Sequence, residues 1–291
     1  MTRLIASDKE DGLSIDCFLQ RRIPAAPSAY LRQLVRKGRL RLNGGPCSGL
    51  ETLQPGDALV LPASRRLAEL LDMGQRQQID ILLEGPDFLV VCKPAGLAVH
   101  RSVGHEADNL ADRVNLWLQR HRRPYRALPV HRLDVGTSGP LLFAKGRRAA
   151  AALGGFFMAG QVEKNYLALV SGTLPEQGEL LSPVPAKGRL RSAVTRYRTL
   201  SRSRHHTLLQ LELISGRKHQ IRRQLADAGH PLVNDRRYGG DMLPNGRWPF
   251  LHCSRLAWPG TADQSLQVVV CPLPAQLTTL LRAVNLTLVD S

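Results

Sequence analysis

The N-terminal part of the chain alternates between short apolar segments and turn residues. Helical spacing of apolar residues predicts two short helices, at 14–22 and 28–38, each beginning with a serine that can cap it. The Asn-Gly pair at 43–44 predicts a tight turn, and the apolar run at 58–61 predicts a strand. This pattern is typical of a small unit that contains both helices and strands.

Beyond residue 79 the apolar segments are longer and more numerous. Alternating or continuous apolar runs predict strands at 79–83, 88–92, 141–144, 163–172, 193–200 and 207–214. Apolar residues at helical spacing predict helices at 110–118, 147–158 and 221–228. Residues 173–192 show neither period, and we expect an irregular loop there.

The change in pattern divides the chain into three parts. We expect a small module at 1–62, a linker at 63–78 that is polar apart from a short leucine patch, and a larger domain at 79–291. Helices and strands are expected in both structured parts, and the predicted fold class is α+β.

The charge of the chain is more informative about its function than its overall composition. Hydrophobic residues make up 43% of the chain, which is ordinary for a globular protein. The net charge is +16, and 33 of the 40 basic residues are arginine. Such an excess favours an anionic partner, either nucleic acid or an acidic membrane surface. Arginine favours phosphate and base recognition because its guanidinium binds phosphate through two hydrogen bonds and stacks on bases.

The cysteines and the apolar segments indicate where in the cell the protein is located. The five cysteines are scattered and none lies in Cys-x-x-Cys spacing, which argues against a disulfide framework and against a cysteine-based zinc site. The N-terminus lacks the pattern of a signal peptide, and no apolar run is long enough to span a bilayer. We therefore expect a cytoplasmic protein with no membrane partner.

The segment at 131–139 presents one carboxylate in a rigid setting. It reads His-Arg-Leu-Asp-Val-Gly-Thr-Ser-Gly and is followed by the apolar run at 141–144. Asp134 thus lies in a turn at the edge of a buried strand, inside a chain whose charge is mostly positive. Such a carboxylate can serve as a nucleophile or a base toward a polyanion. Alternatively, its side chain binds the amides of its own turn.

This segment resembles the signature His-Arg-Leu-Asp-x-x-Thr-Ser-Gly of the RluA-type pseudouridine synthases. The resemblance places Asp134 on the catalytic aspartate of that family and His131 in the substrate site. It also implies that Arg132 fills the space that the target base leaves in the RNA stack. A phosphate contact is an alternative role for Arg132.

Other family elements follow in the same order. Lys93 begins a segment that resembles Lys-Pro-x-Gly-x-x-Val-His, with Arg101 where proline is usual, and this makes Lys93 a substrate-binding candidate. A loop that simply ends the strand is the alternative. In the family a Lys-x-Tyr strand places its tyrosine against the target base, which assigns Tyr166, with Lys164 as a second substrate-binding candidate. A tyrosine packed in the core is the alternative for Tyr166.

The segment from Gly216 resembles the element Gly-Arg-x-His-Gln-Ile-Arg. In the family its last arginine contacts the catalytic aspartate, so the resemblance assigns that role to Arg222, and Arg217 joins the substrate-binding candidates. Two positions depart from the pattern, namely Lys218 where threonine is usual and Gln224 where histidine is common. These departures bear on the positioning of the substrate more than on the chemistry.

The first module resembles the S-four RNA-binding module, named for a ribosomal protein of the small subunit. The order helix, glycine, strand, Asn-Gly and Gly-Asp is present between residues 34 and 57. Seven basic residues and no acidic residue lie between 21 and 41, which makes Arg36 and Arg39 candidates for RNA contacts. A solvated basic face is the alternative.

The resemblance implies a domain with a central, mainly antiparallel mixed sheet, flanking helices and a catalytic cleft. It also implies an isomerase that detaches uracil from its ribose, rotates it and rejoins it through carbon five. That reaction requires no cofactor and no metal. We expect Arg222 to keep Asp134 ionised, because a nearby guanidinium favours the charged form of a carboxyl group. The expected partner of this monomer is RNA, ribosomal RNA of the large subunit first and transfer RNA second.

Two other classes of function use the same residues differently. A non-catalytic RNA-binding or ribosome assembly factor would use the basic surfaces without requiring Asp134. A metal-dependent nuclease would be centred on His230, Asn234 and Asp235, although nucleases usually gather more carboxylates around the metal.

Overall fold

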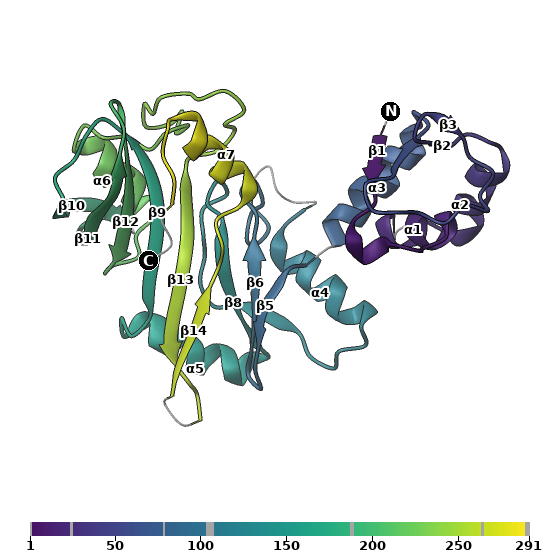
Figure 1. Ribbon diagram of the computed structural model, residues 1–291. Helices are drawn as coiled ribbons and strands as arrows, with labels where there is room; N and C mark the ends of the chain where they lie inside the picture. The colour runs from purple at the N-terminus through teal and green to yellow at the C-terminus, as the bar shows by residue number, and fades with distance from the viewer. Residues whose placement is uncertain are drawn as a thin grey trace. The chain divides into compact units, whose positions relative to one another are not determined.

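The computed structural model describes residues 2–23, 26–77, 79–102, 108–186, 189–262 and 265–288. The chain forms two compact units, Met1–Gln78 and Ile79–Ser291 (Figure 1). Helices and antiparallel sheets occur in both, so the predicted α+β class is confirmed.

The first unit is a four-stranded antiparallel sheet with helices around it. Its strands lie in the order β1-β4-β2-β3. Its elements are β1 (Thr2–Ile5), the 3-10 helix η1 (Asp8–Glu10), α1 (Ile15–Arg22), α2 (Ser28–Arg36), β2 (Arg41–Leu42), β3 (Gly45–Pro46), β4 (Ala58–Leu61) and α3 (Arg65–Gln77). The Asn-Gly pair at 43–44 has positive φ at both residues and joins β2 to β3, as such a pair does in tight hairpins.

The two predicted helices are present, but only one has its predicted cap. Ser14 caps α1, because its hydroxyl accepts a hydrogen bond from the amide of Cys17. Ser28 is instead the first residue of α2, after Pro27 at the cap position, and its hydroxyl donates to Gln20 at 2.7 Å. The fixed φ angle of Pro27 restricts the backbone at the start of the helix, which therefore begins without a side-chain cap.

Residues 65–77 were expected within a linker and instead form helix α3. Leu67 is buried in the core of the first unit, and Leu70 and Leu71 pack against that core. Their i, i+3, i+4 spacing gives the helix one apolar side, which is enough to bind it to the unit despite its polar composition.

The second unit contains two antiparallel sheets. The first has the order β5-β6-β8-β7 and the second the order β10-β11-β12-β9-β13-β14. The strands are β5 (Ile81–Glu84), β6 (Phe88–Lys93), β7 (Ala127–Pro129), β8 (Gly139–Lys145), β9 (Glu163–Ser171), β10 (Gln177–Ala186), β11 (Arg189–Arg202), β12 (His206–Leu213), β13 (Leu251–Pro259) and β14 (Leu266–Val270). The helices are α4 (Leu110–Arg120), α5 (Arg147–Met158), α6 (Gln220–Asp227) and α7 (Ala275–Ala283).

The two sheets meet where β8 begins. A parallel bridge joins Ser138 to His252, so β8 and β13 lie side by side (Figure 1). Gly139 makes this approach possible, because a Cβ atom there would overlap the carbonyl oxygen of Cys253. A single central sheet was expected. The structure instead has two sheets, which this parallel bridge joins.

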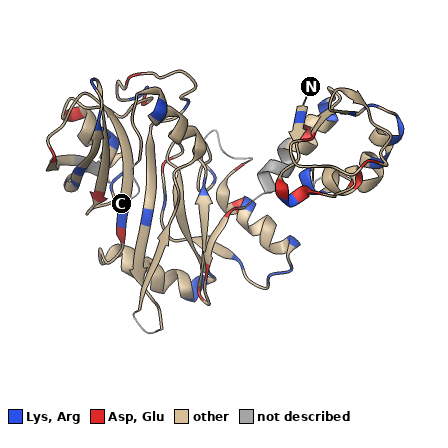
Figure 2. Ribbon diagram, viewed as in Figure 1, with Lys and Arg blue, Asp and Glu red and all other residues tan. Residues whose placement is uncertain are grey.

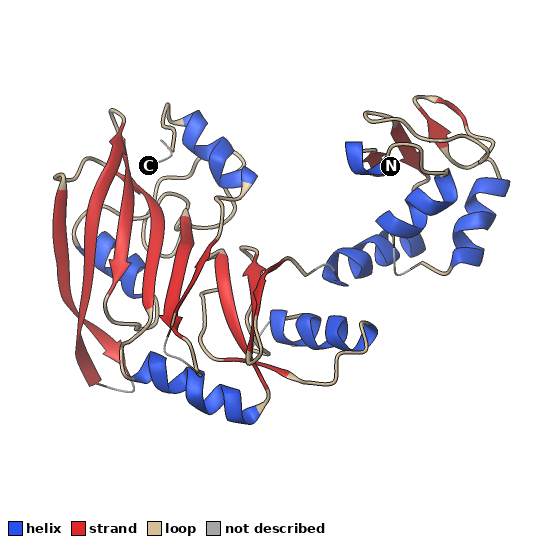
Figure 3. Ribbon diagram, turned by 60° about the horizontal axis from the view of Figure 1, so that its bottom comes forward, coloured by secondary structure: helices blue, strands red, loops and turns tan. Residues whose placement is uncertain are grey.

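Both faces of the first sheet are covered, which explains the continuous apolar runs of β6 and β8. Leu89 and Leu141 face the core that contains α4, whereas Val90 and Leu142 face the core that contains α5. The second sheet is covered in the same way by α6 on one face and α7 on the other (Figure 3). On β9 the residues Tyr166, Ala168 and Val170 share one face, as predicted.

The expectation of an irregular loop at 173–192 is wrong. Residues 177–186 form β10, and β11 begins at 189. Pro183 and Pro185 interrupt the alternation and lack the N–H groups that a central strand needs. β10 is the edge of its sheet, where a missing donor is tolerated.

We predict that Leu142→Ala destabilises the second unit by about 2–5 kcal/mol, because it removes a fully buried side chain from the centre of β8. Leu266→Ala is the matched control, since that leucine is 61% exposed on β14. All three tryptophans lie beyond residue 79, so their fluorescence during urea unfolding reports on this unit alone. Equal loss of stability in the two variants would contradict the assigned core.

Candidate active site

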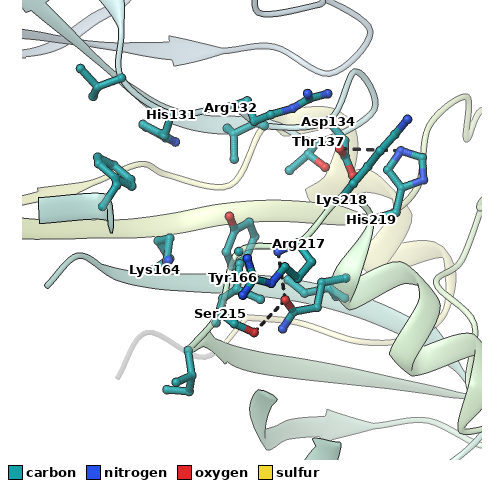
Figure 4. A pocket seen from close by; sticks show the side chains of 18 of the residues that line it. His131, Arg132, Asp134, Thr137, Lys164, Tyr166, Ser215, Arg217, Lys218 and His219 are labelled. Carbon is teal, nitrogen blue, oxygen red and sulfur yellow. Dashed lines mark hydrogen bonds and ion pairs between the residues drawn. The ribbon is translucent and has the colours of Figure 1, made fainter. Parts of the chain in front are cut away.

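A cavity of about 1000 Å³ opens in the second unit. Its walls come from the loop at 130–137, helix α5, the start of β9 and the segment at 213–222. The volume is at the upper end of the range for small-ligand pockets, so a nucleotide fits with room to spare. Seven predicted site residues line it together. Six of them are labelled in Figure 4, namely His131, Arg132, Asp134, Lys164, Tyr166 and Arg217, and the seventh is Arg222.

Asp134 lies in a turn that is anchored from both sides. Its own carbonyl accepts a hydrogen bond from the amide of Thr137 at 3.0 Å. The next carbonyl, of Val135, accepts from the amide of Gly96 at 2.7 Å and from Nζ of Lys93 at 3.2 Å. On the other side, Ser138 forms the bridge to β13. The backbone around Asp134 is therefore held by two separate segments.

The side chain of Asp134 faces the cavity rather than its own turn. Its carboxylate is 18% exposed and lies 3.8 Å from Nε2 of His219 (Figure 4). Within the described part of the chain it accepts no hydrogen bond from the amides of the turn. The alternative in which this carboxylate only stabilises the turn therefore loses its basis.

His219 is a site residue that the sequence did not single out. It is the cap residue directly before α6 and has a left-handed backbone, φ 55°, and its ring lies beside Asp134. Its Nδ1 is 3.1 Å from the hydroxyl of Tyr238. Burial lowers the pKa of His219, and the nearby carboxylate of Asp134 only partly offsets this. The histidine is part of the element Gly-Arg-x-His-Gln-Ile-Arg, but its left-handed backbone conformation could not be predicted from the sequence.

Arg222 does not contact Asp134 directly, contrary to the expectation. Its guanidinium donates two hydrogen bonds, of 2.6 and 2.7 Å, to the carboxylate of Asp235, which is buried. It also lies over the ring of Tyr238, 5.0 Å from the centroid. Burial by itself lowers the pKa of Arg222, but Asp235, with a smaller contribution from Asp134, outweighs it and the pKa is raised. Arg222 is thus a fixed positive charge in the wall of the cavity.

Tyr166 projects from β9 into the cavity (Figure 4). Burial, followed by the charges of Cys253 and Asp134, raises its pKa well above the ordinary value of 10. The phenol is therefore neutral at physiological pH. Tyr166 belongs both to the hydrophobic core and to the cavity wall, so the two roles weighed for it are compatible.

His131 and Lys164 form the end of the cavity nearer to α5. The ring of His131 stacks on Phe157 with centroids 4.8 Å apart, and its Nε2 accepts a hydrogen bond from the amide of Leu142. Burial, followed by the charge of Lys164, lowers the pKa of His131 to about 3. His131 is therefore an uncharged wall residue. Burial also lowers the pKa of Lys164.

The arginines at the site differ in exposure. Arg132 is exposed at the cavity, and Arg217 is partly buried, with its Nε atom shielded from solvent and without a hydrogen-bond partner in the described structure. Lys218, which stands where the family has threonine, adds a third, exposed cation to the lining. The rim of the cavity is therefore basic.

Three predicted site residues do not line the cavity. Lys93 is fully buried behind the turn, where burial lowers its pKa to about 7. It supports Asp134 through the Val135 carbonyl rather than facing a ligand. Arg36 and Arg39 are exposed on the first unit.

The residues proposed for a nuclease have other partners. Both carboxylate oxygens of Asp235 bind Arg222, Asn234 accepts a hydrogen bond from the amide of Leu243, and Nδ1 of His230 is 3.0 Å from the carbonyl of Ser171. Among the described residues no cluster of three histidine, cysteine, aspartate or glutamate side chains is arranged to hold a metal ion. The segment serves instead as an anchor for Arg222.

Among the described residues, no helix combines the length and the apolar character that crossing a membrane requires.

Comparison with known proteins agrees with the geometry. Residues 87–227 match the family described as RNA pseudouridylate synthase. Ribosomal large subunit pseudouridine synthase D of Xylella fastidiosa is 35% identical over 258 residues, which cover 82% of this chain and 75% of that protein. Ribosomal large subunit pseudouridine synthase C of Yersinia pestis is 34% identical, with 80% and 78% covered.

A solved structure shares the fold. Human RNA pseudouridylate synthase domain containing 4 superposes with a TM-score of 0.64 over 77% of this chain and 98% of that one, at 22% identity. The sequence relationship and the shared fold lead to one conclusion. The chain belongs to the RluA-type family of pseudouridine synthases, isomerases that convert uridine to pseudouridine in RNA.

Proposed function

We propose that this enzyme isomerises specific uridines of large-subunit ribosomal RNA in the cytoplasm, as a monomer without cofactor or metal, and that Asp134 is its catalytic carboxylate. The observation that carries the proposal is the carboxylate of Asp134, which faces a nucleotide-sized cavity and is not engaged by its own turn. The names of the relatives from Xylella fastidiosa and Yersinia pestis support ribosomal RNA as the substrate.

The reaction needs an ionised carboxylate beside the ribose. Asp134 acts there either as a nucleophile at the anomeric carbon or as a base toward a sugar proton, and both routes require its negative charge. The guanidinium of Arg222, fixed by Asp235, supplies a positive charge in the same wall.

The uracil base needs a flat, uncharged surface while it is detached and turned. Tyr166 provides a neutral phenol in the cavity wall, and His131 is also uncharged. A base within an RNA helix must first leave its stack at a cost of a few kcal/mol. We assign to Arg132, exposed at the cavity, the filling of the vacated space.

The first unit supplies RNA affinity in this proposal, as an S-four-like module. Its exposed basic side chains include Arg36 and Arg39, and neither forms an ion pair with a described residue. Lys and Arg also lie on the second unit (Figure 2). Phosphate contacts of this kind orient the RNA and read little sequence.

We predict that Asp134→Asn lowers turnover by about 10³-fold or more while RNA affinity stays within about threefold, because only the reacting charge is removed. The assay uses ribosomal RNA labelled with tritium at carbon five of uridine. Isomerisation releases the label, simple binding leaves the RNA intact and labelled, and cleavage shortens it. Asp227→Asn, exposed on α6, is the control. Wild-type-like turnover by the Asp134 variant would remove this residue from the mechanism.

We predict that Asp235→Asn lowers turnover by about 10²-fold without weakening RNA binding. The substitution keeps the size of the side chain but removes the charge that holds Arg222, whose guanidinium then loses its orientation. The control is Asp241→Asn, at an aspartate whose side chain is 59% exposed and lies 3.6 Å from Nε2 of His206. Unfolding curves of each variant separate a loss of turnover from a loss of structure. Full turnover by a folded Asp235 variant would refute the positioning role of this pair.

We predict that the double variant Arg36→Ala/Arg39→Ala binds RNA about tenfold more weakly and that the slope of log affinity against log salt decreases by about one to two. Each lost phosphate contact removes roughly 0.7–0.9 from that slope. Arg65→Ala, whose side chain is 95% exposed on α3 of the same unit, is the control. Titrations of labelled RNA at several salt concentrations measure the slope. An unchanged slope would exclude this basic face from the RNA interface.

A further inference from the structure

Two cysteines far apart in sequence lie side by side in the second unit. Cys92 is in β6 and Cys271 directly follows β14, 179 positions later, yet their sulfur atoms are 3.2 Å apart. All five cysteines of the chain are free thiols. This pair could not be predicted from the sequence, because its spacing matches no known cysteine motif.

The backbone holds both residues in place. The amide of Cys92 donates to the carbonyl of Asp80 at 2.8 Å, and the amide of Cys271 donates to the carbonyl of Ser254 at 2.9 Å. Cys271 is buried and Cys92 is partly exposed, so a small reagent can reach the pair from the side of Cys92. A disulfide needs its sulfur atoms about 2.05 Å apart, which requires only a modest approach of the two side chains.

The two thiols differ in acidity. The hydrogen bond between the sulfurs lowers the pKa of Cys92. Burial and the charge of Asp80 oppose this effect, and the smaller contribution of Lys93 adds to it, so the pKa stays below its ordinary value. The same hydrogen bond, together with burial, raises the pKa of Cys271. Cys92 is thus the more nucleophilic partner and Cys271 the resolving one, as in thiol pairs that respond to oxidants.

We propose that Cys92 and Cys271 form a thiol-oxidation site that a peroxide closes to a disulfide. The Cys92 thiolate attacks one oxygen of hydrogen peroxide, which gives a sulfenic acid and hydroxide. The sulfur of Cys271 then attacks the sulfur of Cys92 and displaces the hydroxyl group. Two thiols and one peroxide yield one disulfide and two waters, and thiols such as glutathione reverse the bond.

The disulfide lies next to the groups that hold the Asp134 turn. Lys93, adjacent to Cys92, donates to the carbonyl of Val135. The carbonyl of Cys271 accepts from Nε2 of His252, whose Nδ1 accepts from the hydroxyl of Ser138. The new bond therefore ties together the two anchors of this turn and closes a long loop, which stabilises the folded unit.

The test uses full-length Cys17→Ser protein, which lacks the exposed lone thiol. The protein is fully reduced, treated with hydrogen peroxide, denatured and alkylated with iodoacetamide. We expect alkylation of only Cys47 and Cys253, a Cys92–Cys271 cross-linked peptide in mass spectrometry, and full recovery of the thiols after reduction. We also expect the Tm of the oxidised protein to rise by about 5 °C.

Adding Cys92→Ser or Cys271→Ser should abolish both the cross-link and the Tm increase. Cys47→Ser, another buried cysteine of the chain, is the matched control and should leave both unchanged. Recovery of all four thiols after peroxide treatment would overturn the proposal. Oxidation of Cys92 to sulfinic acid without a cross-link would overturn it too.

Discussion

The carbonyl group of Val135 fixes the position of Asp134. It accepts hydrogen bonds from the amide of Gly96 and from the buried ammonium of Lys93. Lys93 is the last residue of β6, and Gly96 lies in the segment that follows it. On the other side of the aspartate, Ser138 is joined to β13. Because both sheets of the second unit contribute an anchor, the carboxylate is held at the point where they meet. A shift of either sheet would move it away from the cavity.

Most groups around this carboxylate keep one protonation state at physiological pH. Arg222 is fixed by a buried aspartate, and the phenol of Tyr166 and the ring of His131 are kept neutral by burial. Burial also lowers the pKa of His219, whose Nε2 lies 3.8 Å from the carboxylate of Asp134. The cavity therefore combines the carboxylate of Asp134 with the neutral side chains of Tyr166 and His131, the fixed positive charge of Arg222 and a basic rim. This combination suits a neutral pyrimidine attached to a polyanionic backbone.

Much of the fold and part of the site could be predicted from the sequence. Strands buried on both faces, such as β6 and β8, show continuous apolar runs, and the turn residues after Asp134 marked its position. The partner of Arg222 could not be predicted, because Asp235 lies 13 residues away and only the packing of α6 against the next loop brings them together. The edge strand β10 could not be predicted because its two prolines suggest a loop. Helix α3 could not be predicted because its apolar side is short.

The structure explains one of the two departures from the family pattern. Gln224, where histidine is common, is buried and binds the hydroxyl of Thr195 and the carbonyls of Leu180 and Ala193. It therefore ties α6 to β10 and β11 and supports the helix that carries Arg222. Lys218, in contrast, is exposed at the cavity, where it adds to the basic rim.

The account is tested most directly by mapping pseudouridines in large-subunit ribosomal RNA at single-nucleotide resolution. The RNA comes from cells that lack the gene and from the same cells carrying either the wild-type gene or its Asp134→Asn form. The account predicts that at least one pseudouridine disappears without the gene, returns with the wild-type copy and stays absent with the Asn copy. Its return with the Asn copy, or an unchanged map in cells without the gene, would contradict it.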